Sequence, residues 1–330
     1  MRKKVMSIFW VIGIAALVFL VYRIGPAQIW EHIRRITLEK FLLLFALRFV
    51  FFAFKALNWK IVISQYEKGI SFPQLLAARI TGDAISYLTP SALLGGEPVR
   101  AMMVKCQDDK KCFASVVIDK TIEVFTLIFL IIVGISIAAI QIALPRRYKF
   151  FFILFAVCAI LFSLLILFRQ QKGFFSWLVK LLHRFNIRPK FLEKNMENIQ
   201  ETDELISKFY SHHKGIFSIV FVLHSISFMF WIYEIFLTLK LTGAEAVTFL
   251  KSFLVTTLGC LVILLPSTPA SIGTYEITYV TLIVLVGIAA GAGVTLTLMR
   301  RIISVSWAGI GLFLMLMTPR TKKIGDKEIE

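Results

Sequence analysis

The chain alternates between long apolar runs and short polar stretches, a pattern that predicts helices crossing a lipid bilayer. Spanning the hydrocarbon core takes roughly 20 residues of helix, and several runs reach or approach that length. They lie at about residues 5–22, 41–63, 124–144, 150–168, 216–239, 277–299 and 302–317. The short alternating segments of a membrane β-barrel are absent from the sequence. We therefore predict an all-α, polytopic membrane protein with a single integral membrane domain over residues 1–330.

Two segments, residues 72–105 and 247–276, are too interrupted by glycine and proline to be ordinary spans. Irregular backbone at membrane depth is tolerated only where protein or a cavity surrounds it. We expect each segment either to enter the membrane and return or to cross it once, which gives seven or eight crossings. The interrupting residues that we assign to the breaks are Pro90, Gly95, Gly96, Pro98, Pro266, Pro269 and Gly273.

The two broken segments contain similar phrases. Residues 90–97 read PSALLGGE and residues 269–276 read PASIGTYE, about half a chain apart. Broken helices in corresponding halves of a transporter are the best sequence pointer to its binding site. We predict half-repeats at about 41–168 and 215–318, joined by a connector at 169–214. The alternative is chance, since Pro, Gly and Ser recur in any broken membrane segment.

The charge distribution predicts orientation and partners. The net charge of +17 would suggest nucleic acid in a soluble protein. Here the basic residues cluster between apolar runs, so anionic lipid headgroups and the positive-inside bias explain them and nucleic acid is not an expected partner. The basic N-terminus, the 105–111 loop and the connector all favour the cytoplasm. The connector begins with an amphipathic helix, typical of the membrane interface. The C-terminal tail is expected inside if residues 247–276 cross once, and outside if they form a hairpin.

Charged residues within apolar sequence are the candidate functional groups, because ionisable side chains in the membrane are costly. We predict a polar cavity lined by Glu97, Arg100, Asp119, Glu123 and Glu276, with further candidates at Arg79, Asp83 and Glu234. The alternative is that these charges pair with one another and fix a buried polar core. Arg48 and Lys55, in the second span, either snorkel to the surfaces or face the protein interior.

Other motifs are missing or uninformative. The four cysteines form no C-x-x-C pair and no Cys/His cluster, so we expect neither a metal site nor a disulfide framework. No phosphate loop or hydrolase motif is present, and we assign no catalytic residue and no cofactor. Arg146, Arg147 and Lys149 are predicted to form a tight loop, and Arg300 and Arg301 to separate the last two spans.

Several of these phrases resemble one family. GDAISYLTPSALLGGEPVR at 82–100, PASIGTYE at 269–276 and ALNWK at 56–60 look like the membrane domain of the lysylphosphatidylglycerol synthase/flippase family. The resemblance covers about residues 5–318, and G-G-E-P-x-R is its most specific element. Two-domain members add a soluble domain that transfers lysine from lysyl-tRNA to phosphatidylglycerol, and their membrane domain is associated with flipping the product. Only a short charged tail follows the last apolar run here, so aminoacyl transfer is not expected of this chain.

The resemblance and the broken segments together predict a lipid translocator of a bacterial or archaeal cytoplasmic membrane. Its partners would be membrane lipids, either an anionic phospholipid or a polyprenyl-phosphate-linked lipid. Arg100 would contact phosphate, so that the anionic part of the lipid meets the first copy of the repeated phrase. The carboxylates would contact an amine or carry a coupling proton. The alternatives are a lipid-modifying enzyme with a separate soluble partner, and a scaffold that recruits envelope-synthesis enzymes.

Overall fold

The computed structural model describes residues 37–89, 95–141, 146–185, 196–263, 269–271 and 273–318. Within these ranges the chain forms helices and turns and no strand, which confirms the all-α prediction. The predicted first span at 5–22, and the break residues Pro90 and Pro266, lie outside the described residues.

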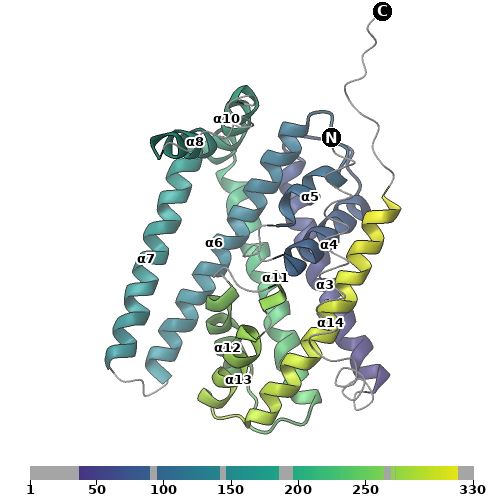
Figure 1. The fold of residues 1–330 in the computed structure, drawn as a ribbon, viewed down its shortest axis with the longest axis vertical. Helices are drawn as coiled ribbons and strands as arrows, with labels where there is room; N and C mark the ends of the chain where they lie inside the picture. Colours follow the sequence, from purple (N-terminus) through teal and green to yellow (C-terminus); the bar gives the residue numbers. More distant parts are fainter. Residues whose placement is uncertain are drawn as a thin grey trace, which may run out of the picture.

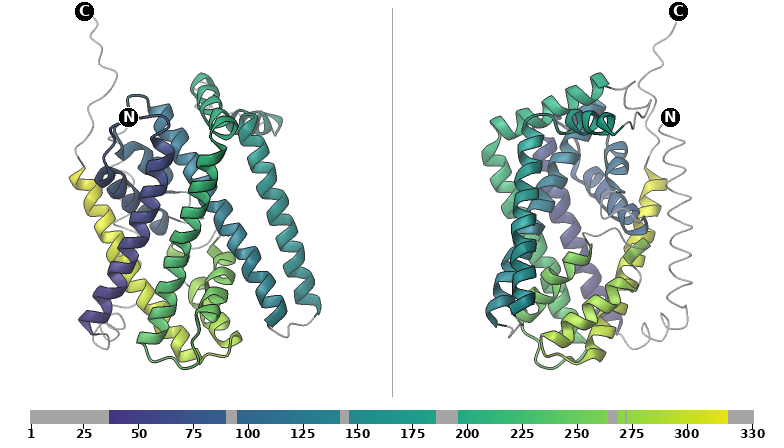
Figure 2. Two further views of the ribbon diagram at one scale, coloured as in Figure 1. Left: turned by 180° about the vertical axis from the view of Figure 1, so that it is seen from behind. Right: turned by 60° about the vertical axis from the view of Figure 1, so that its left-hand side comes forward.

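Five helices of the described chain are long and apolar enough to cross a membrane, which confirms a polytopic membrane protein. Four of them pack together in a bundle, and α7 stands at its edge with most of its surface exposed (Figure 1; Figure 2). The five are α3 (Leu38–Ile63), α6 (Asp109–Gln141), α7 (Arg146–Gln171), α11 (Lys214–Leu241) and α14 (Ala290–Met317). Arg146, Arg147 and Lys149 all belong to α7, so the tight loop predicted at these residues is wrong.

Both broken segments enter the bundle and return to the face from which they came. The first consists of α4 (Phe72–Leu88) and α5 (Glu97–Met103). The second consists of α12 (Phe249–Ile263), the short turn η1 (Pro269–Ser271) and α13 (Thr274–Leu285). The outer ends of α4 and α5 share a cluster with the end of α3, while those of α12 and α13 share one with the end of α11. The two hairpins therefore point toward each other from opposite ends of the bundle (Figure 1).

The first hairpin is tight because two glycines let its arms touch. A Cβ added to Gly96 would lie 1.8 Å from the carbonyl oxygen of Gly82. The amide of Gly96 also donates a hydrogen bond to Ser86 Oγ at 2.9 Å. The glycine of the GGE phrase is thus required by a close backbone approach rather than by an unusual backbone angle, since φ at Gly96 is −89°.

The last part of the chain differs from the prediction. A turn at Gly287, with φ of 74°, separates α13 from α14, and α14 then continues through Arg300 and Arg301 without a break. The predicted span at 277–299 therefore covers most of the short helix α13 and the first part of α14, and the predicted span at 302–317 is the second part of α14. A hairpin followed by one crossing returns α14 to the face of the connector. The prediction that a hairpin would place the tail on the opposite face is consequently wrong.

The described part of the connector forms two helices at one end of the bundle, α8 (Phe174–Arg184) and α10 (Met196–His212) (Figure 2). The carboxylate of Asp203 accepts hydrogen bonds from the amides of Phe175 and Ser176 at 2.9 and 2.7 Å. A carboxylate at this position satisfies amides that the helix leaves unpaired and interacts favourably with its dipole. This contact fixes α8 against α10.

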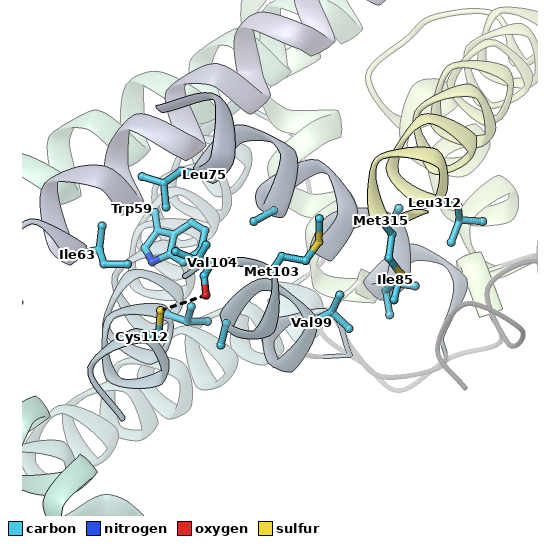
Figure 3. Packing of buried hydrophobic residues seen from close by; sticks show 14 of the residues in the cluster. Trp59, Ile63, Leu75, Ile85, Val99, Met103, Val104, Cys112, Leu312 and Met315 are labelled. Atoms are coloured by element: carbon cyan, nitrogen blue, oxygen red, sulfur yellow. Dashed lines mark hydrogen bonds between the residues drawn. The ribbon is translucent and has the colours of Figure 1, made fainter. Parts of the chain in front are cut away.

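A compact apolar core surrounds the first hairpin (Figure 3). Trp59 of α3, Met103 of α5 and Met315 of α14 are all buried in it. Cys106 and Cys112 lie in the same core and form a disulfide. The expectation of no disulfide is therefore wrong: a pair six residues apart has no recognisable spacing, but the chain between α5 and α6 brings the two sulfurs together.

Replacing Gly96 with alanine is expected to destabilise the protein by about 1–3 kcal/mol, because the added methyl group must displace the backbone of Gly82. Equilibrium unfolding of the purified protein in mixed detergent micelles would measure the loss. Gly309→Ala is the matched control, since a Cβ there meets nothing within 4 Å. Equal stability of the two variants would contradict the close approach.

Candidate functional site

Asp119 is the centre of a buried network of charges. Its carboxylate is fully buried and accepts from Arg100 at 2.7 Å and from Arg79 at 3.2 Å. His224 Nε2 lies 3.2 Å from its other oxygen. His224 Nδ1 in turn lies 3.0 Å from Asn58 Nδ2 of α3. Asp119 thereby joins five helices, α3, α4, α5, α6 and α11.

Arg79 and Arg100 each hold more than one carboxylate. Arg79 donates to Glu123 at 2.7 Å and lies 3.4 Å from Asp83, one turn along α4. Arg100 donates to Glu97 at 2.7 Å, and its guanidinium lies 4.4 Å from the ring centre of Trp59. Both arginine side chains are fully buried. Pairing of this kind is what makes buried charges tolerable in a low-dielectric interior.

Two lysines complete the network on the side that faces a cavity. Lys55 lies 2.9 Å from Glu123 and 3.3 Å from Asp83. Lys120 lies 3.2 Å from Glu97 and 3.5 Å from Glu123. At 1.5 Å of rise per residue, Lys120 is roughly 17 Å along α6 from its start. These charges are thus well inside the bundle and not at its surface.

Two further ion pairs lie nearer the opposite face. Arg48 of α3 binds Glu234 of α11 through two parallel hydrogen bonds of 2.8 and 2.7 Å. Arg301 of α14 donates to Glu276 at 2.7 Å and to the hydroxyl of Tyr87 at 3.1 Å. It also donates to the carbonyl of Ala270 in η1. Arg301 therefore ties the inner end of the second hairpin to α4 of the first.

A cavity of about 230 Å³ lies between the inner ends of the hairpins. One part of its wall carries Lys55, Asp83, Lys120 and Glu123, and another carries Arg48, Arg300 and Arg301. Aromatic and aliphatic side chains form much of the rest, among them Phe51, Phe52, Leu127, Phe228, Trp231, Tyr275 and Trp307, and hydroxyl groups such as that of Ser304 are also present. An apolar pocket with a few convergent polar groups is the usual form of a small-ligand site.

Arg300 is the exception among the buried basic side chains. Lys55, Arg79, Arg100, Lys120 and Arg301 each have a carboxylate within 4 Å. Within the described part of the chain Arg300 has none, and its Nη1 has no hydrogen-bond partner. Its guanidinium lies against aromatic rings instead, 5.1 Å from Trp231 and 5.9 Å from Tyr275. A buried cation without an anion is costly.

The structure brings most of the predicted residues together but separates them into groups. Arg79, Asp83, Glu97, Arg100, Asp119 and Glu123 share one network, as both interpretations of the sequence require. Only Asp83 and Glu123 of that set also line the cavity. Glu234 and Glu276 belong to the separate pairs with Arg48 and Arg301. Gly273 donates its amide to Glu276 at the start of α13, at 2.8 Å.

Sequence reasoning misses most cations of the cavity. It does not decide between surface and interior for Arg48 and Lys55, and both face the interior. It places a break between spans at Arg300 and Arg301, although both are buried within the continuous helix α14. The described residues contain no group of three or more His, Cys, Asp and Glu side chains that could hold a metal ion.

Opposed broken hairpins around a charged intramembrane cavity define a polytopic membrane protein built around a polar site. The chain belongs to the family described as the lysylphosphatidylglycerol synthase TM region, which it matches over residues 7–311.

Two curated relatives from archaea are similar over nearly their full length. A UPF0104 membrane protein of Methanothermobacter thermautotrophicus is 26% identical over 97% of this chain and 98% of its own. A UPF0104 membrane protein of Pyrococcus horikoshii is 24% identical over 89% of this chain and 91% of its own. No solved structure matches the chain significantly.

Replacing Asp119 with asparagine is expected to cost about 3–5 kcal/mol of stability, because Arg79 and Arg100 then lose the charge that they share. Thermal and denaturant unfolding in detergent would measure it. Glu204→Gln, which removes an exposed carboxylate beside Lys208 on α10, is the control and should have no measurable effect. Asp119→Asn with wild-type stability would show that the network does not support the fold.

Proposed function

We propose that this protein moves a lipid between the leaflets of its membrane, passing the polar headgroup through the cavity while the acyl or prenyl tails stay in the bilayer. The observation that carries the proposal is the cavity itself, which is charged and lies where two hairpins meet from opposite faces. Family membership supports a lipid-related role.

The charges give the cavity a physical reason to lower the barrier. A single charge at the centre of a bilayer costs at least about 3 kcal/mol on insertion scales and more in other estimates. Lys55, Lys120 and Arg301 would replace water around a headgroup with fixed polar groups at that depth. The cavity also has apolar walls, such as Phe52 and Phe228, which suit the part of the lipid next to the headgroup.

The hairpins supply the means for alternating access. Arg301 connects the two hairpins across the cavity through Tyr87 and Ala270. Each hairpin is anchored at a different face, so a small shift of one against the other would open the cavity to one side at a time. We place the path between the hairpins and not along α7.

Filling the cavity is expected to stop leaflet exchange. Ser304 lines the cavity from α14, and Ser304→Phe would occupy much of the space. In vesicles containing purified protein and fluorescent phosphatidylglycerol, dithionite quenching reports exchange, which should fall at least about tenfold. Ser306→Phe, on the same helix but outside the cavity lining, is the control. Undiminished exchange in a stably folded Ser304→Phe variant would refute a path through the cavity.

A further inference from the structure

We propose that Arg300 is the anchor for a lipid phosphate, and that the site selects a headgroup carrying phosphate without an ammonium group. This inference rests on the proposed function and names the substrate class of the same cavity. A net cationic headgroup such as an aminoacylated phospholipid would be a poor ligand.

The first argument is that Arg300 is buried with its charge unused. It is 6% exposed and, within the described residues, has no carboxylate within ion-pair distance. Every other buried lysine or arginine of those residues has such a partner. Removing a cation from water without an anion is unfavourable by several kcal/mol. An incoming phosphate would supply the missing charge, and a guanidinium matches phosphate oxygens through two parallel hydrogen bonds.

The second argument is that uncharged donors line the same cavity. Trp231 Nε1 and Trp307 Nε1 are buried and make no hydrogen bond to the described chain. An indole N–H can only donate, so each needs an acceptor. Arg300, Ser304 and Trp307 follow one face of α14, at intervals of four and three residues, and all line the cavity. The oxygens of one phosphate could accept hydrogen bonds from these three side chains together.

The third argument is that an ammonium group would find no free anion. Asp83 and Glu123 are the carboxylates of the cavity wall. Lys55 and Arg79 hold Asp83, and Lys55, Arg79 and Lys120 hold Glu123. Three aromatic rings of the cavity wall already have a cation against them. Arg300 lies over Trp231 and Tyr275, and the Lys55 ammonium lies 4.7 Å from the ring centre of Phe51.

The size of the cavity agrees with a small headgroup. Sites for drug-sized ligands enclose about 300–1,000 Å³, and this cavity encloses about 230 Å³. That space suits a phosphate with a short substituent and excludes a whole lipid. The tails would therefore remain outside the site, as the proposed function requires.

The test is a binding measurement that does not depend on transport. Tryptophan fluorescence of the purified full chain in detergent would be titrated with dihexanoyl phosphatidic acid, dihexanoyl lysylphosphatidylglycerol and inorganic phosphate. We expect phosphatidic acid to bind at least about tenfold more tightly than either of the other two. Arg300→Met should weaken phosphatidic acid binding roughly 10- to 100-fold, the effect of losing charge-assisted hydrogen bonds.

The matched control is Arg169→Met at the end of α7. Arg169 also lies over a tryptophan, 4.8 Å from the ring centre of Trp177, but outside the cavity lining. The Arg169→Met variant should bind phosphatidic acid as tightly as the wild type does. Arg300→Met should also keep its thermal midpoint, because it removes a charge that leaves no partner behind. A lowered midpoint with unchanged affinity would make Arg300 a structural residue and overturn the inference.

The remaining outcomes separate this inference from the proposed function. Equal or tighter binding of the lysyl lipid would overturn the headgroup selection, even if leaflet exchange occurs. Equal binding of inorganic phosphate would overturn the assignment to a lipid. Arg300-dependent binding of phosphatidic acid without leaflet exchange would uphold the site and reject translocation.

Discussion

The arrangement of the bundle depends on one constraint: charges that lie within its interior must be paired there. Asp119 meets this constraint by contacting Arg79, Arg100 and His224, which come from three other helices. Arg79 and Arg100 come from the first hairpin, which precedes α6, whereas His224 comes from α11, more than a hundred residues further along the chain. Apolar packing alone would tolerate sliding or rotation of membrane helices, whereas shared carboxylates permit few alternatives. The network therefore fixes the relative positions of α3, α4, α6 and α11 along their axes.

The same constraint explains why the hairpins end where they do. A re-entrant segment exposes backbone groups at its tip, and these need partners that lipid does not provide. Ser86 serves Gly96 in the first hairpin, and Arg301 serves the carbonyls of Ala270 and Ser271 in the second. These backbone groups, in the described residues beside each tip, are thus satisfied by side chains that line the cavity. The same polar side chains therefore line the cavity and hydrogen-bond the broken backbone.

The sequence predicts the membrane helices well where apolar runs are uninterrupted, as for α3 and α11. It fails at α14, because Arg300 and Arg301 read as a loop although they are the buried cations of a continuous helix. Carboxylates are easier to recognise, since a carboxylate at membrane depth needs a partner inside the protein, while a basic residue can equally face a lipid headgroup. Pairings such as Arg48 with Glu234 join residues nearly two hundred positions apart, and a single sequence carries no signal for them. Half-repeats over 41–168 and 215–318 stay a prediction.

The two copies of the repeated phrase differ in a way that bears on the ligand. In the first copy, Glu97 is neutralised by Arg100 three residues later, and that arginine is then saturated by Asp119. In the second copy, Tyr279 occupies the corresponding position, and Glu276 takes its cation from α14. Arg300 lies 5.9 Å from the ring centre of Tyr279 and has no carboxylate partner within the described chain. The sequence favours the first copy as the half that meets the anion, because it holds its own arginine. A saturated arginine attracts little, so the available positive charge lies beside the second copy, which is why we propose the anion site there and not at the first copy.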